Sequence, residues 1–319
     1  SSANEGVAAR CGLVSESTDS TVTVSGNNFS ATFNTRTGAL CGLDYGGKQI
    51  VAPGSELALD AFRAYLNNDA WVYGGWFSNG VYNLRHKAVS SKVFDAADGR
   101  KVLSFTVESQ APNGGRMTGG NGNSKGVYSI DESESAPFGE DDFKFITNQV
   151  WTVSADGTVE LNSVISSNNP SVILPRLGYS VSVPETFGNY TYYGRGPEEN
   201  YNDRKTGQFV GRYASSVDKQ FTDYTRPQSN GNREEVRWAA LTDGNEGVIF
   251  IAPEKMSATA IPYSEMELFK ANHPYKLPDS KTTTLHLDLG VTGLGGASCG
   301  QGGPLDHDRV KATEHRFNF

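Results

Sequence analysis

The stretch Thr21–Val51, TVTVSGNNFSATFNTRTGALCGLDYGGKQIV, decides the fold class. Apolar and polar residues alternate along it, which is the period of a β-strand whose successive side chains point to opposite faces. Turn-forming residues interrupt the alternation at Gly26–Asn28, Thr37–Gly38 and Gly46–Gly47. We therefore predict a series of short antiparallel strands joined by tight turns.

The same pattern returns along most of the chain. Two short polar segments, SADG at 154–157 and TDGNEG at 242–247, have the composition of hairpin turns. Helical periodicity is limited to one or two turns within 55–69, and 112–142 has no apolar period, which predicts a long mobile or substrate-side loop. The predicted fold is all-β, a large antiparallel sandwich with polar loops at its rims. Its further strands are expected in 101–110, 143–167, 174–184, 236–253, 257–264 and 282–291.

Composition excludes several classes of protein. The net charge of −8 argues against nucleic acid as a partner, because phosphate binding needs a cationic surface, and no apolar run is long enough to cross a membrane. The polar residues 1–20 are expected to be a tail or linker. Cys11, Cys41 and Cys299 lack the spacing of a zinc site, so no metal is predicted and the redox compartment stays open.

The segment 192–207, YYGRGPEENYNDRKTG, is the densest cluster of polar and aromatic residues. It lacks the third glycine and the following helix of a phosphate-binding loop. Glu198 and Glu199 are neighbours that point to opposite faces of extended chain, so they are poorly placed to flank one glycosidic bond. The competing interpretation is a turn in which Asn200, Asp203 and Arg204 hold the loop to its surroundings by hydrogen bonds and ion pairs.

Three other candidate residues are weaker. Glu246 lies within a predicted hairpin turn, so we expect a solvated tip rather than an acid/base residue. His307 lies between two aspartates, but alternation would place it on the opposite face from them, which disfavours a shared metal. His286 lies on the strand face opposite Leu285 and Leu287, so it is expected to face solvent or a groove.

Taken in order, four motifs resemble the C-terminal domain of family 2 β-galactosidases. They cover residues 21–319 and imply one large supersandwich domain of two twisted antiparallel sheets, like that of galactose mutarotase, with 1–20 as the remnant of a preceding linker. The four motifs are FRAYLNND at 62–69, YYGRGPEENYNDRKTG at 192–207, YTRPQSNGNREEVRW at 224–238 and TTLHLDLGVTGLGGASCGQGGP at 283–304.

The resemblance also implies a division of labour. In that family the catalytic glutamates lie on a separate (β/α)₈ barrel, which requires alternating strands and helices that this chain lacks. The chain is then expected to have no catalytic residue, to be inactive alone, and to need no cofactor. Its partners would be the barrel, the other domains of the parent and a β-galactoside or related oligosaccharide. The family-motif residues, expected to organise a rim loop against the barrel, are Arg63, Asn68, Asp69, Glu198, Asn200, Tyr201, Asp203 and Arg204.

The resemblance further implies an outer wall of the substrate site. The family loop with the pattern T-W-L-x-[IV]-D corresponds to Thr283–Asp288, where Thr284 replaces the tryptophan. The wall candidates are therefore Thr284, His286, His273 and Tyr275, with Trp71 and Trp76 as further aromatic substitutes.

Two alternatives remain at this level. A stand-alone carbohydrate-binding module would use aromatic residues such as Trp151, Tyr179 and Trp238 to stack on sugar rings. A mutarotase-like enzyme would need His273 or His286 to face a carboxylate across a groove. The glycoside that the parent cleaves and the oligomeric state stay open, and the Thr/Asn/Gly-rich composition favours a periplasmic or secreted protein.

Overall fold

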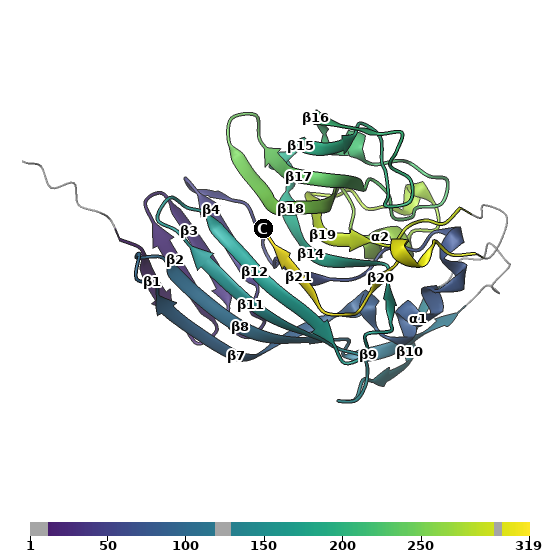
Figure 1. Cartoon of the computed structure of the whole chain (residues 1–319), viewed down its shortest axis with the longest axis horizontal. Coiled ribbons are helices and arrows are strands. Elements are labelled where there is room, and N and C mark those ends of the chain that lie inside the picture. The colour runs from purple at the N-terminus through teal and green to yellow at the C-terminus, as the bar shows by residue number, and fades with distance from the viewer. Residues whose placement is uncertain (1–11, 119–128, 297–301) are drawn as a thin grey trace, which may run out of the picture.

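The computed structural model describes residues 12–118, 129–296 and 302–319, and nearly all of their regular structure is antiparallel β (Figure 1). This confirms the predicted fold class. Asn28, Gly38 and Gly46 in the first three hairpin turns have positive φ, as tight turns between strands often require. The first sheet keeps the chain order of its five strands: β1 (Val14–Ser17), β2 (Thr21–Gly26), β3 (Phe29–Asn34), β4 (Leu40–Tyr45) and β5 (Lys48–Gln49).

The second sheet packs against the first. Trp151 is buried and contacts the ring of Phe33 edge-on, with 5.4 Å between the ring centroids, and its indole N–H donates to the Gly38 carbonyl at 3.2 Å. The segment 154–157 joins two strands of this sheet, which confirms the predicted hairpin turn. The strand order is β21 (His315–Asn318), β12 (Val159–Ser167), β11 (Phe145–Val153), β8 (Lys101–Gln110) and β7 (Arg85–Asp95).

The third sheet has seven strands and occupies the other half of the molecule in Figure 1. The segment 242–247 joins two of them, and Glu246 at this turn is half-exposed and ion-paired with Lys48, so the predicted hairpin tip is confirmed. The strand order is β16 (Phe209–Ser216), β15 (Asn189–Gly196), β17 (Arg233–Thr242), β18 (Gly247–Ile261), β19 (Thr282–Val291), β14 (Arg176–Pro184) and β6 (Ala58–Asp60).

The division into sheets differs in detail from the two sheets that the resemblance implies. Only one isolated bridge, between Leu40 and Leu57, connects the first sheet to the segment that leads into β6. Hydrogen-bonded pairing is therefore interrupted there, and the described residues form three larger sheets and two small ones. In addition, β1 pairs with β2, so the first sheet begins inside the polar segment that the sequence predicts as a tail.

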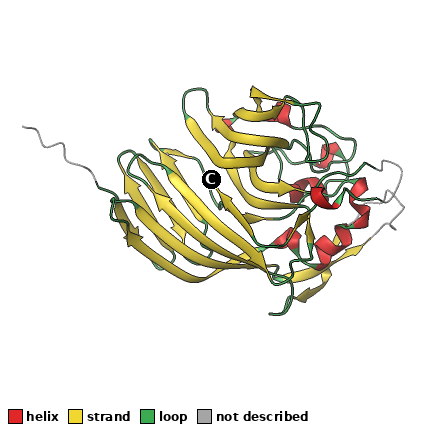
Figure 2. Cartoon of the chain, viewed as in Figure 1, coloured by secondary structure: helices red, strands yellow, loops and turns green. Residues whose placement is uncertain are grey.

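Short elements fill one end of the fold, where Figure 2 shows the helices gathered. The predicted loop 112–142 is wrong in its described part, because its two ends pair as strands; backbone pairing needs no apolar alternation, so periodicity misses such a hairpin. Among the described residues no helix is long and apolar enough to cross a membrane. The short elements are β9 (Asn113–Thr118) paired with β10 (Ser129–Pro137), β13 (Ile173–Leu174) paired with β20 (Val310–Lys311), α1 (Tyr73–Ser78), α2 (Glu265–Lys270), η1 (Asn67–Trp71), η2 (Val81–Asn83), η3 (Glu185–Phe187), η4 (Val217–Gln220), η5 (Pro274–Lys276) and η6 (Asp306–Asp308).

Strand β19 buries both of its faces. Leu285 and Leu287 lie on the apolar face with the buried residues of the main core. The opposite face carries Thr284, His286 and Asp288, which are also buried. A sheet face built from polar side chains is stable only when other groups satisfy them, so the elements that cover it have to supply partners.

Arg176 supplies the main partner. Its guanidinium, almost fully buried, donates to Asp288 Oδ2 at 2.8 Å and to Glu265 Oε1 at 2.7 Å. The other oxygen of Glu265 accepts the backbone N–H of Ala64 at 2.7 Å, and Ser229 donates to Oε1 at 2.9 Å. Arg176 and Glu265 together thus connect β14, β19, α2 and two segments between strands.

We expect Arg176→Met to lower the free energy of unfolding by about 3–5 kcal/mol, because it leaves two buried carboxylates without their cation. Arg100→Met is the matched control, since Arg100 pairs with Asp98 on the surface and such pairs contribute at most about 1 kcal/mol. Urea unfolding of the two variants measures the difference. Equal losses in the two variants would contradict the central role of the buried network.

Candidate functional site

The family-motif residues lie together, although they come from distant parts of the chain. Arg63 is fully buried and grips Asp69 with two nitrogens, Nη2 to Oδ1 at 2.5 Å and Nε to Oδ2 at 3.2 Å. Its remaining nitrogen, Nη1, donates to the carbonyl of Thr292, more than two hundred residues away in sequence. A planar guanidinium with five donors suits this bidentate grip, so the first motif is fastened to the last.

The segment 292–295 is held from three sides. Asp203 accepts the backbone N–H groups of Leu294 at 3.0 Å and of Gly295 at 2.7 Å. Arg204 Nη2 donates to the Gly295 carbonyl at 2.5 Å, and Asn68 Nδ2 donates to the Leu294 carbonyl at 3.3 Å. These contacts fix the path of a loop that has no regular structure of its own.

The turn in the middle of the second motif is held by Asn200. Asn200 is buried; its Nδ2 donates to the carbonyls of Arg195 and Glu198 at 3.1 and 2.9 Å, and its Oδ1 accepts the Glu234 N–H at 3.0 Å. Glu199 accepts the Tyr201 hydroxyl at 3.0 Å, whereas Glu198 is exposed. The two neighbouring carboxylates therefore do not face each other across a shared space.

Two ring hydroxyls are linked to Glu199. The hydroxyl of Tyr224 donates to Glu199 Oε1, and the backbone N–H of Gly231 donates to Oε2 at 2.8 Å. Burial raises the pKa of Tyr201 well above its ordinary value, and the Glu199 charge raises it further. The carboxylate is thus engaged by three donors and holds the second motif against the third.

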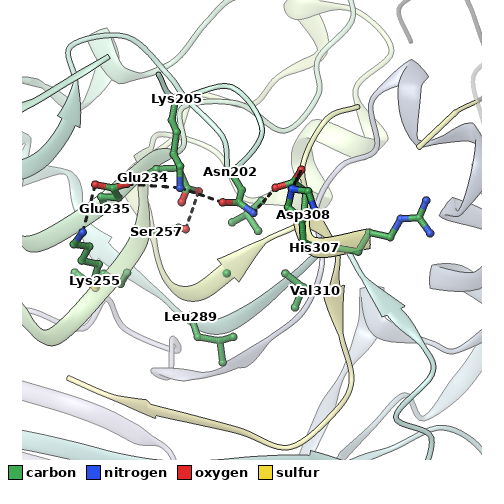
Figure 3. Close-up of a pocket in the computed structure, with 14 residues that line it drawn as sticks. Asn202, Lys205, Glu234, Glu235, Lys255, Ser257, Leu289, His307, Asp308 and Val310 are labelled. Carbon is green, nitrogen blue, oxygen red and sulfur yellow. Dashed lines mark hydrogen bonds and ion pairs between the residues drawn. The ribbon is translucent and has the colours of Figure 1, made fainter. Parts of the chain in front are cut away.

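Beside these motifs lies a pocket of about 310 Å³ (Figure 3). A row of polar side chains crosses it: Lys255 is 3.6 Å from Glu235, Glu235 is 3.7 Å from Lys205, and Lys205 donates to Asn202 at 3.1 Å. Asn202 in turn donates to Asp308 Oδ1 at 2.9 Å. Each charged group in this row has a partner of opposite charge or a hydrogen bond.

The pKa values of the two neighbouring glutamates of this pocket are shifted in opposite directions. Burial raises the pKa of Glu234, an effect only partly offset by hydrogen bonds from Ser257 and Asn232. Burial has the same tendency at Glu235, but the hydrogen bond from Arg195 and the surrounding cations outweigh it and lower the pKa below its usual value. Glu235 also has a positive φ of 53°, which is uncommon for a residue other than glycine. Both carboxylates are engaged, so the pocket offers contacts to a polar ligand rather than a free acid or base.

The predicted wall residues are divided between two places. The segment 283–288 lies in the interior of β19, which confirms the strand expected at 282–291 and corrects the loop that the resemblance implies there. Both faces of this strand are buried, and Thr284 and His286 on its polar face are only 8% and 1% exposed. These two line a groove at the edge of the polar sheet face. His273 stacks on Tyr275 at 5.3 Å in an exposed segment instead.

Several aromatic candidates lie in the interior. Trp76, Trp151 and Tyr179 are almost completely buried, so the proposed stacking platform of Trp151, Trp238 and Tyr179 is wrong for two of its members. The reason is that both point from their strands into the main core. Trp238 lies at the outer face, 6.0 Å from the Arg212 guanidinium, and Trp71 packs under the Arg309 guanidinium at 4.5 Å.

Two features of the structure could not be predicted from the sequence. No local sequence pattern indicates the buried ion-pair network at Arg176 or the left-handed backbone at Glu235.

Within the described ranges no group of three or more His, Cys, Asp or Glu side chains could hold a metal ion. Cys41 is half-buried and burial raises the pKa of its thiol, while Cys11 and Cys299 lie outside the described residues.

We expect acidification to destabilise the fold partly through His86, which lines the same groove as His286 and contacts Ser109 Oγ through Nδ1 at 2.8 Å. Burial, with the nearby Arg85 charge, lowers the pKa of His86 from 6.5 to about 4. The unfolded chain therefore binds more protons between these values, so stability present above pH 6.5 is lost as pH falls toward 4. Urea unfolding across this range should show a shallower loss for His86→Asn, and identical slopes would refute the assignment.

Comparison with known proteins identifies the family to which most of the chain is similar. Residues 25–319 match the family model described as β-galactosidase small chain. The β-galactosidase of Priestia megaterium is 29% identical over 91% of this chain and 25% of that protein. The β-galactosidase of Halalkalibacterium halodurans is 26% identical over 94% of this chain and 27% of that protein.

A solved structure, the galactose 1-epimerase of Lactobacillus acidophilus, aligns with 96% of both chains at 6% identity and a TM-score of 0.38. The chain spans about a quarter of the length of these two β-galactosidases. The family model covers nearly all of the chain, and its match includes all four motif segments. The chain belongs to the β-galactosidase small-chain family.

Proposed function

We propose that this chain is the C-terminal domain of a retaining β-galactosidase-type glycoside hydrolase, in which it packs on a catalytic barrel and shapes the outer part of the substrate site. The proposal rests on how much of each chain is matched in the comparisons. The relatives match over more than nine-tenths of this chain but devote only about a quarter of their own length to it. A part that small leaves room elsewhere for the catalytic machinery of the parent.

The motif contacts support a scaffolding role for the named residues. Arg63 pairs with Asp69 and also donates to the backbone of 292–295, and Asp203 accepts two backbone N–H groups of the same segment. Groups engaged in this way position a loop and are not available as acid or base. We infer that this held loop forms the rim that meets the barrel and borders the aglycone.

The purified 319-residue chain is expected to show no turnover of a chromogenic β-galactoside, because the two carboxylates that retention requires would lie elsewhere in the parent. The full-length parent, assayed beside it, should be active. Turnover by the chain alone with the kinetics of the full-length enzyme would overturn the proposal.

In the full-length parent, Asp203→Ala should lower kcat/KM at least tenfold, because it releases the backbone N–H groups of Leu294 and Gly295. Asp218→Ala, at an exposed position in η4, is the matched control and should keep wild-type kinetics. Steady-state kinetics on two β-galactosides with different leaving groups would separate an aglycone effect from a general loss of folding. Equal kinetics of the two variants would show that the rim loop does not border the site.

A further inference from the structure

An apolar cleft of about 490 Å³ lies where the three larger sheets meet. Leu40 and Leu43 of β4 line it from the first sheet, and Trp151 of β11 lines it from the second. The third sheet contributes the first half of β18. None of the lining residues belongs to the four motif segments, so the cleft is separate from the candidate site.

Strand β18 has an unpaired edge at this cleft. Residues 247–251 pair with β17 on one side, whereas β19 pairs with β18 only from Ser257 onward. In the described chain no strand therefore pairs with the other edge of 247–251, and Figure 1 shows the hairpin of β17 and β18 extending past the rest of its sheet. Such an edge presents backbone N–H and C=O groups that a further strand can pair with.

The edge also lacks the charges that commonly protect exposed strands. The segment VIFIA at 248–252 has no charged residue and no proline, and Ile249 and Ile251 are 52% and 57% exposed. Natural proteins usually charge or cover an apolar edge, because it otherwise pairs with other chains. The edge strand β7 of the second sheet, in contrast, carries Arg85, Lys87, Lys92 and Asp95.

The free edge is held in place by the rest of the chain. Lys48 of β5 pairs with Asp243 at 2.5 Å and with Glu246 at 2.8 Å, at the turn between β17 and β18. These pairs join the tip of the hairpin to the first sheet. A strand edge that is already positioned loses less conformational entropy when a partner binds.

The charge of the lining restricts the partner. Asp156 and Glu160 are its charged residues, and within the described chain their hydrogen-bond partners, the Thr158 N–H and Asn162 Nδ2, are neutral. The N–H of Thr158 lowers the pKa of Asp156, so this carboxylate is ionised at neutral pH. A second copy of the chain would bring the same acids together, and like charges oppose association. A segment with Lys or Arg among apolar residues is complementary instead.

We propose that an extended segment of the parent polypeptide, from outside these 319 residues, adds a strand to the free edge of β18. Its apolar side chains occupy the cleft, and a Lys or Arg lies near Asp156 and Glu160. Backbone hydrogen bonds supply the affinity of such an addition, and the cleft supplies the selectivity. The inference rests on the proposed function, because it needs a longer parent. The two relatives have only 25% and 27% of their length in the matched part, so most of such a parent lies outside this chain.

Hydrogen exchange at single-residue resolution, on the purified chain and on the full-length parent, tests the proposal. In the purified chain the amides of 247–251 that point away from β17 should exchange fast, and in the parent the same amides should exchange roughly tenfold more slowly or less. In the parent, Ile249→Asp should restore fast exchange, because it places a carboxylate in the apolar contact. Val93→Asp makes a similar change on the exposed edge strand β7 and should leave these amides protected.

Glu160→Lys provides a second variant in case Ile249→Asp does not fold. Glu160 is exposed, and reversal of its charge should also speed exchange of the edge amides in the parent. Turnover of a β-galactoside by the same parent preparation reports separately on the proposed function. An active parent whose edge amides exchange as fast as in the purified chain would overturn the strand addition and leave the proposed function intact. Protection that persists in both folded variants would overturn it as well. An inactive parent with protected edge amides would contradict the proposed function but support the strand addition.

Discussion

The buried ion pairs of Arg176 are the constraint on which the seven-stranded sheet depends. The guanidinium lies between Asp288 on β19 and Glu265 on α2, and each carboxylate is nearly inaccessible to water. Burial raises the pKa of Asp288 to about 7, although the Arg176 charge opposes this shift. A buried ion pair rarely adds stability over apolar side chains of similar volume, but loss of one partner is strongly destabilising. The network therefore specifies which elements cover the polar face.

The same polar face explains why the groove has unsatisfied groups. Arg176 reaches Asp288 and Glu265, but two positions along β19 from Asp288 the sheet continues with His286, which receives no protein partner. A fold selected only for stability would replace this imidazole with an aliphatic side chain. His286 therefore marks where the part of this sheet face that the ion pairs close comes to an end.

The sequence alone predicts the parts of the fold that depend on local chemistry. Alternation in Thr21–Val51 and the glycines between its strands determine the hairpins, and the alternation of 282–291 correctly separates Leu285 and Leu287 from His286. It does not show that the opposite face is also buried, because burial there depends on α2 and on Glu265. The hairpin of β9 and β10 and the left-handed backbone at Glu235 were missed for the same reason: long-range pairing and packing determine them.

The candidate site shows how motif order can be informative before its geometry is known. Arg63, Asp203 and Thr292 are far apart in sequence and have no common local pattern, yet side chains of the first two fasten the backbone that follows the third. A charged side chain that hydrogen-bonds to distant backbone atoms cannot be replaced alone without loss of stability, because each substitution leaves a buried donor or acceptor unpaired. The motifs therefore behave as one unit that fixes the path of 292–295. A loop held by such a unit has its shape fixed by side-chain hydrogen bonds, although no helix or strand supports it.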